Sequence, residues 1–121
     1  MQTRTRGDQS EEAAAQYLIS QGMKVLERNF HCRTGEIDLI GRDQDSLVFV
    51  EVRSRRPGAL VDGVESVNFR KQRRLIAAAR FYLHRYGLHD FPCRFDVIGV
   101  THCQENGYDF DWITNAFNDT P

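Results

Sequence analysis

Two short stretches of alternating apolar and charged residues constrain the fold more than any other feature of the chain. They are residues 35–40 (GEIDLI) and residues 49–53 (FVEVR). A period of two residues is typical of a β-strand with one face in the core and the other towards solvent. The residues between them, 41–46, are rich in turn formers, which predicts an antiparallel hairpin over about residues 36–53.

The alternation also predicts which side chains share a face of this hairpin. The polar face would carry four charged residues: Glu36, Asp38, Glu51 and Arg53. The apolar face would carry two aliphatic pairs, Ile37 with Leu39 and Val50 with Val52. Antiparallel pairing would bring Asp38 and Glu51 to one edge, and two carboxylates beside a cation suit metal-assisted attack on a phosphate. The plain alternative is the solvent face of an ordinary half-buried strand.

Two further segments have the apolar spacing of amphipathic helices. The first would begin with Asp8 as N-cap and Glu11 as its capping-box partner, and would stop at Gly22. The second would be capped by Ser66 or Asn68 and would stop at Gly87. We expect the polar side of the second helix to carry five cations: Arg70, Lys71, Arg73, Arg74 and Arg80.

The remaining segments predict three more strands and one long loop. The strands are expected at residues 24–30, 94–100 and 108–113, the last after a turn at Asn106-Gly107. Residues 54–64 are expected to form a loop, the best candidate for a mobile segment. The element order is therefore α-β-β-β-α-β-β in a single domain of 121 residues. The simplest packing is an α/β fold in which helices flank a mixed sheet.

The charge is strongly segregated although the net charge is only −1. Residues 53–86 contain nine Arg or Lys residues and two acidic residues, whereas the flanking segments are acidic. A basic centre between acidic flanks favours a local site for a polyanion such as nucleic acid. The alternatives are a solvated helix face and an adaptor surface for an acidic protein partner.

The composition predicts a cytoplasmic protein with no membrane partner. No apolar run approaches the roughly 20 residues that a membrane helix needs, and no apolar segment follows the charged start as in a signal peptide. Three cysteines, Cys32, Cys93 and Cys103, are too few and odd in number for a disulfide framework. Structural zinc is disfavoured because no Cys-x-x-Cys pair is present.

Motifs distributed along the chain resemble the bacterial YraN-type family. They are Gly7-x-x-x-Glu11, Arg28-Asn-Phe30, residues 35–40, residues 49–53, Arg94-Phe-Asp96 and Asn115-Ala-Phe117. That family is placed in the restriction-endonuclease-like, or PD-(D/E)xK, superfamily, near Holliday junction resolvases. The superfamily signature is an acid on the first helix, an Asp on one strand and Glu-x-Lys on the next. Glu11, Asp38 and Glu51 match its three acids.

The resemblance implies a metal-dependent nuclease that acts on DNA, including branched or structured DNA. Glu11, Asp38 and Glu51, with the backbone carbonyl of Val52, would hold Mg²⁺ or Mn²⁺, and Arg53 would stabilise charge on the phosphate. We expect six cations to follow the phosphate backbone: Arg55, Arg56, Arg70, Lys71, Arg73 and Arg74. We also expect a homodimer, because one small domain cannot address both strands of a duplex.

The chain departs from the signature at one position, where Arg53 replaces the lysine of Glu-x-Lys. Arginine stabilises phosphate charge well, but it stays protonated and cannot accept a proton. Only Lys24 and Lys71 among the 16 cations are lysines, so a general preference for arginine also explains Arg53. Two interpretations follow: an active nuclease, with Lys71 projecting into the site from the second helix as one further hypothesis, or a non-catalytic nucleic-acid-binding protein that retains the nuclease fold.

Overall fold

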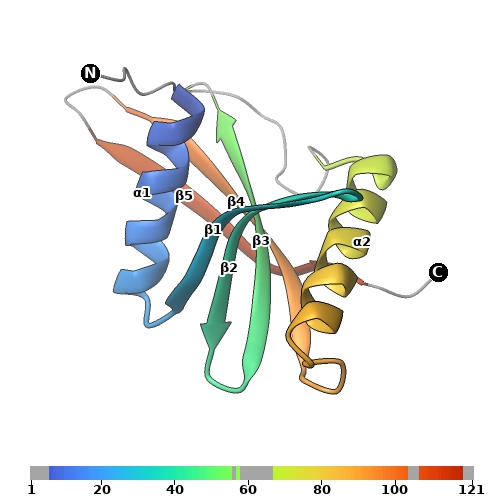
Figure 1. Cartoon of the computed structure of the whole chain (residues 1–121). Helices are drawn as coiled ribbons and strands as arrows, with labels where there is room; N and C mark the ends of the chain where they lie inside the picture. Colours follow the sequence, from blue (N-terminus) through green and yellow to red (C-terminus); the bar gives the residue numbers. More distant parts are fainter. Residues whose placement is uncertain (1–5, 56, 58–66, 104–106, 119–121) are drawn as a thin grey trace, which may run out of the picture.

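The computed structural model in Figure 1 describes residues 6–55, 57, 67–103 and 107–118. Its elements are α1 (Arg6–Ser20), β1 (Lys24–Cys32), β2 (Gly35–Asp43), β3 (Ser46–Arg55), α2 (Phe69–Arg85), β4 (Cys93–His102) and β5 (Tyr108–Phe117). The predicted order and the mixed-sheet α/β class are confirmed. None of the described helices is long and apolar enough to span a membrane.

The five strands form one sheet in the order β1-β2-β3-β4-β5. Neighbouring strands are antiparallel except β3 and β4, which are parallel. A parallel pair needs a crossover connection, and α2 lies in the connection between these two strands. The central strand β3 is buried on both faces from Leu47 to Val50, as expected of a strand covered by a helix on each side.

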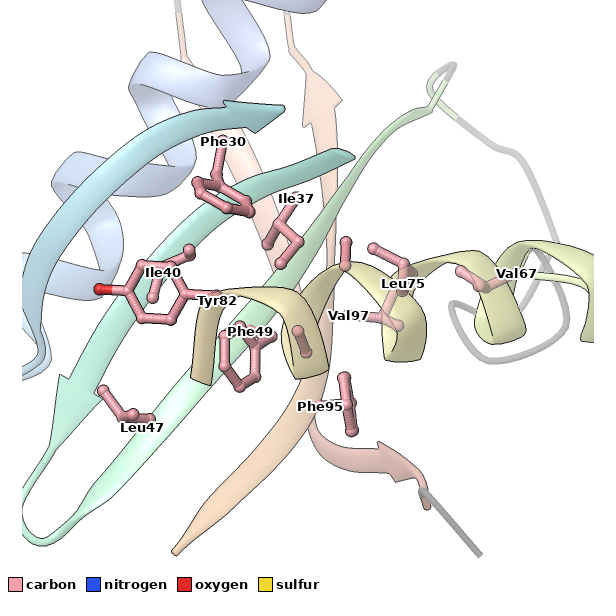
Figure 2. Packing of buried hydrophobic residues seen from close by; sticks show 12 residues of the cluster. Phe30, Ile37, Ile40, Leu47, Phe49, Val67, Leu75, Tyr82, Phe95 and Val97 are labelled. Carbon is pink, nitrogen blue, oxygen red and sulfur yellow. The ribbon is translucent and has the colours of Figure 1, made fainter. Parts of the chain in front are cut away.

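The two helices cover opposite faces of the sheet and so create two cores (Figure 1). On the α2 face, Phe49 lies 5.6 Å from Phe95 and 5.9 Å from Tyr82 between ring centroids, and Tyr82 also contacts Phe30 (Figure 2). The α1 face is built by aliphatic residues: Leu18, Leu39, Val48, Val50, Ile98 and Val100. Burying these side chains is the main term that holds the helices to the sheet.

Glycines end both helices as predicted, but the start of the first helix differs. Gly22 has φ 100° and Gly87 has φ 65°, conformations that favour glycine after a helix. The Asn68 side chain caps α2 by accepting a hydrogen bond from the Lys71 amide at 2.9 Å. The prediction that Asp8 is the N-cap of the first helix was wrong, because α1 begins at Arg6 and Asp8 lies within its first turn.

The predicted loop at residues 54–64 is wrong at its beginning. Ser54 and Arg55 continue β3 and pair with Val100 and Thr101 of β4, because the parallel ladder extends two residues further than the alternating pattern. Residues 56 and 58–64 lie outside the described residues. The same holds for Asn106 of the predicted turn before β5.

Strand β2 contradicts the predicted pairing of Ile37 with Leu39. Ile37 belongs to the α2-side core and Leu39 to the α1-side core. The strand bends between them, and Asn29, which lies between the partners of these two residues on β1, has a left-handed backbone with φ 53°. The bend carries the far end of the β1–β2 hairpin towards α2 (Figure 1), so strict alternation fails there.

A fully buried acid, Asp96, joins β4 to its neighbours. Its carboxylate accepts hydrogen bonds from the Arg94 guanidinium at 3.0 Å, the Trp112 indole at 2.9 Å and the backbone N–H of Asn115 at 2.9 Å. Arg94 also reaches Asp43 in the β2–β3 hairpin at 3.0 Å. Asp96 therefore pairs with an arginine and acts as a structural link between three parts of the sheet.

We expect Asp96→Ala to lower the free energy of unfolding by about 3 kcal/mol, because it removes the buried acceptor of the half-buried Arg94 guanidinium and of two further donors. Urea denaturation followed by fluorescence of the single tryptophan, Trp112, measures the loss. Asp96→Asn, which keeps part of the acceptor capacity, is expected to lose less. Asp45→Ala in the exposed β2–β3 turn is the control, and a loss there as large as at Asp96 would contradict the assignment.

Candidate active site

The candidate site lies where β2 separates from β3. Regular pairing of the two strands runs from Asp43 and Ser46 to Leu39 and Val50. Beyond that last pair, the backbone amide of Val52, two residues after Val50, donates to the carboxylate of Asp38, one residue before Leu39, at 2.8 Å. In a regular β-ladder the Val52 N–H would donate to a backbone carbonyl of the neighbouring strand; here the Asp38 side chain accepts this hydrogen bond instead. Asp38 is half-buried at this point of separation.

Glu51, on β3 beside this point, is only 4% exposed. One of its oxygens, Oε1, lies 2.7 Å from the Lys71 ammonium and 3.8 Å from the Arg53 guanidinium. Two cations from different elements therefore face one buried carboxylate oxygen. The predicted association of Arg53 with Glu51 is present in the structure, but Lys71 is the closer partner.

Lys71 reaches Glu51 because it lies on the core-facing side of α2. The buried residues of this helix include Leu75, Ala78 and Tyr82, and Lys71 precedes Leu75 by four residues on the same stripe. Its expected place on the polar side of the helix holds only in part, because the side chain is 43% exposed but its ammonium contacts the buried Glu51; this contact supports the hypothesis that Lys71 projects into the site. The sequence did contain a signal for this position: Lys71 lies four residues before the buried Leu75, and this helical spacing indicates its direction better than its charge does.

Glu11 approaches the same place from α1. It precedes Ala14, Ala15 and Leu18, which are all buried against the sheet, on that side of the helix. Its side chain interacts with the Asp38 carboxyl both electrostatically and by hydrogen bonding. Asp38 interacts with Glu51 in the same two ways. The three acids from α1, β2 and β3 are therefore brought together, with Asp38 between the other two.

A small polar cluster that the sequence did not reveal fixes the helix turn that carries Glu11. The buried Ser10 hydroxyl lies 3.0 Å from the Ser54 hydroxyl and 2.9 Å from Nε2 of His102. These contacts tie the first turns of α1 to the ends of β3 and β4. Ser10 is 44 positions from Ser54 and 92 positions from His102 along the chain, so no local pattern predicts their contact.

Burial, together with the charge of a neighbouring acid, raises the pKa of both central acids. Burial, as the largest cause, raises the pKa of Asp38 to about 6; the Val52 hydrogen bond opposes the rise and the charge of Glu11 adds to it. Burial and then the charge of Asp38 raise the pKa of Glu51 to about 7, against the lowering effect of Lys71. Perturbed acids of this kind are typical of functional sites.

The donor chemistry of the site suits a hard divalent cation. Carboxylate and backbone carbonyl oxygens are the ligands that Mg²⁺ prefers, and a bound cation would offset the charges of Asp38 and Glu51, whose burial raises their pKa values. Among the described residues, no three Asp, Glu, His or Cys side chains already stand in a metal-holding arrangement. Binding would therefore require the acids to ionise and adjust.

The remaining arginines divide into two groups. Arg55 was expected to face phosphates, but its side chain is only 14% exposed; it packs over Gly99 and pairs with Asp111 at 3.3 Å. A Cβ at Gly99 would lie 2.7 Å from this guanidinium, so glycine makes room for it. Of the other arginines that were expected to contact phosphates, Arg70, Arg73 and Arg74 are exposed on α2, and Arg56 lies outside the described residues.

The raised pKa values predict how stability depends on pH. Because Asp38 and Glu51 bind protons more tightly in the folded protein, the free energy of unfolding should fall as pH rises from about 4 to about 7. In EDTA at pH 8 we expect Asp38→Asn to raise this free energy by on the order of 2 kcal/mol. The advantage should vanish towards pH 4.5, where the folded protein already keeps both carboxyls protonated.

Urea denaturation at half-unit pH steps tests this expectation. Asp45→Asn, a change of the same kind in an exposed turn, is the matched control and should show no pH-dependent difference from the wild type. Destabilisation by Asp38→Asn at pH 8 would mean that the repulsion between the acids is weaker than the hydrogen bonds lost.

Comparison with known proteins identifies the family. The model described as "Uncharacterised protein family UPF0102" matches residues 10–100. A UPF0102 protein of Marinobacter nauticus is 54% identical over 114 residues, 94% of this chain and 93% of the relative. One of Nitrosococcus oceani is 50% identical over 116 residues, 94% of this chain and 92% of the relative. The chain therefore belongs to the UPF0102 family, the YraN-type family that its motifs resemble.

Proposed function

We propose that the protein is a metal-dependent nuclease of the restriction-endonuclease-like class, acting on DNA. The observation that carries the proposal is the convergence of Glu11, Asp38 and Glu51 at the separation of β2 from β3, with a lysine ammonium on Glu51. An acidic cluster with raised pKa values has little structural benefit, because each buried charge costs free energy. Phosphodiester hydrolysis gives the cluster a purpose.

The roles of the residues follow from their positions. Glu11, Asp38 and Glu51, with the Val52 carbonyl, would hold Mg²⁺ or Mn²⁺ through hard oxygen ligands. When bound, such a metal lowers the pKa of coordinated water and offsets charge on the phosphate. The Val52 amide fixes the orientation of Asp38 by its hydrogen bond, and the Ser10 cluster holds the turn that carries Glu11.

Lys71 supplies the cation that the Glu-x-Lys signature places on the strand. Its ammonium already contacts Glu51 at 2.7 Å, and the Asn68 cap fixes the backbone of its helix turn. A lysine at this point can orient an attacking water and donate to a phosphoryl oxygen. Arg53, which is half-buried 3.8 Å from the same carboxylate, then stabilises phosphate charge, so its departure from the signature removes no function.

The second candidate function is nucleic-acid binding without cleavage. The contact between Lys71 and Glu51 also fits this function, because it neutralises the most buried of the three site acids with no metal. Calorimetry with Mg²⁺ and Mn²⁺ at pH 8 separates the two: the nuclease should bind metal, and Asp38→Asn should weaken binding at least about tenfold. A cleavage panel of linear, flapped and four-way DNA completes the test. If the wild-type protein neither bound metal nor cleaved any of these substrates, the nuclease function would be excluded.

We expect Lys71→Ala to lower kcat by on the order of 10²-fold, as removal of a single charge-stabilising donor does. Arg53→Lys alone should leave kcat within about threefold, because Lys71 already occupies the role. The double variant Lys71→Ala/Arg53→Lys should recover part of the loss, since it returns a lysine to Glu51 from β3. Initial rates on the best substrate of the panel measure all three.

Arg80→Ala is the matched control, since it removes an exposed cation from the outer side of the same helix. A strong gain of activity in Arg53→Lys, with no effect of Lys71→Ala, would assign the missing role to position 53. Cleavage of both strands of a duplex is expected to need a homodimer, which light scattering with and without DNA can detect.

A further inference from the structure

The outer surface of α2 carries an unbalanced concentration of positive charge. Residues 69–85 contain six Arg or Lys residues and no acid. Three cations in its first two turns are exposed: Arg70, Arg73 and Arg74. Cations near a helix N-terminus are disfavoured by the helix dipole, and like charges three or four residues apart repel each other. A bound polyanion would offset both effects.

An exposed aromatic ring lies within this cationic surface. Phe69, the first residue of α2, is 70% exposed, the largest exposure of any large hydrophobic side chain among the described residues. It belongs to neither core, although Val67 and Leu75 on either side of it are buried. The Arg73 guanidinium lies 5.6 Å from the centre of its ring. A flat ring with a guanidinium beside it is the combination on which nucleobases stack.

We propose that this surface binds nucleic acid through an unpaired base stacked on Phe69, while Arg70, Arg73 and Arg74 contact the flanking phosphates. The proposal rests on the nucleic-acid part of the proposed function and names the ligand class. The preferred ligand is a single strand, or a duplex with unpaired bases, because a blunt duplex keeps the faces of its bases stacked internally. A purely acidic protein surface would use the arginines but would leave the exposed ring unused.

The position of Phe69 relative to the acidic site is consistent with one continuous strand of nucleic acid. Phe69 lies two residues before Lys71, so the two side chains leave the helix on roughly opposite sides. The same helix end therefore presents a stacking surface outside and the Glu51 contact inside. The helix is about 10 Å across, so a strand that passes around this end would reach both.

The chain offers a matched control at the other end of α2. Tyr86 is 50% exposed, and the Arg85 guanidinium lies 5.7 Å from the centre of its ring. The pair repeats the chemistry of Phe69 and Arg73 about 25 Å away along the helix. If any exposed aromatic with an arginine neighbour sufficed for binding, the two positions would respond alike.

The test is fluorescence anisotropy with a labelled 20-nucleotide single strand and the blunt duplex of the same sequence, in EDTA to prevent cleavage. We expect Phe69→Ala to weaken binding of the single strand by about fivefold or more, the effect of losing one stacked base. Binding of the blunt duplex should change less than about twofold, since it exposes no base to stack. Phe69→Trp should retain binding of the single strand, and Tyr86→Ala should leave both ligands unaffected.

The other outcomes overturn the proposal in distinguishable ways. If Phe69→Ala weakened binding of both ligands equally, or of neither, base stacking on Phe69 would be excluded. The proposal that the protein binds DNA would not be affected by that result. Failure of the wild type to bind either ligand at low salt would remove the proposal together with the nucleic-acid part of the proposed function. Binding of poly-glutamate but of neither DNA would assign the surface to an acidic protein partner. Circular dichroism of each variant shows that the helix is retained.

Discussion

The hydrogen bond from the Val52 amide to the Asp38 carboxylate is the interaction on which both the shape of the sheet and the site depend. It satisfies a strand donor at the point where regular pairing of β2 and β3 ends. With that donor satisfied, β2 is free to bend, and the hairpin that it forms with β1 packs against α2. The approach is close: a Cβ at Gly35 would lie 2.9 Å from the Arg74 carbonyl oxygen. The same bond leaves the Asp38 side chain facing Glu51 and Glu11.

Two groups of buried acids in one sheet show opposite arrangements. Asp96 is surrounded by donors from Arg94, Trp112 and Asn115, so its charge is fully compensated and its role is cohesion. Asp38 and Glu51 interact with each other, and burial is the largest cause of their raised pKa values; the charge of Glu11 adds to the rise at Asp38 and the charge of Asp38 to the rise at Glu51. A chain selected only for stability would replace such a pair by apolar residues. Local conflict of this kind, within a fold that is otherwise well satisfied, is typical of functional sites.

The sequence predicted the parts of the structure that depend on local pattern. Alternation over residues 35–40 and 49–53 was enough to place the hairpin, and glycine positions were enough to end both helices. Prediction failed where tertiary contacts decide. The bend at Asp38 moved Ile37 to the opposite core, and the parallel ladder with β4 extended β3 to Arg55. No pattern within a single strand contains the information for either event.

The placement of Lys71 shows how charge can conceal a helical phase. Its position four residues before Leu75 marks it as core-facing, yet its neighbours Arg70, Arg73 and Arg74 make the whole segment look like one solvated surface. Only the inner member of such a cluster can meet a buried carboxylate, and the acid that it meets comes from a different element. The charge of these residues determines that their partners are anionic. Their position around the helix determines which of them faces Glu51 and which face solvent.

The helical position of Lys71 changes what holds its ammonium group beside Glu51. A lysine at position 53 would be held by the register of β3, which is fixed by pairing on both sides. Lys71 is held instead by the packing of α2, in which Tyr82 contacts Phe49 and Phe30 (Figure 2). The Asn68 cap fixes the same helix turn. Helices shift against a sheet more readily than strands slip within one, because packing contacts adjust whereas hydrogen-bonded register does not. The proposed nucleic-acid ligand on the outer surface of α2 would therefore contact the same element that positions the ammonium group beside Glu51.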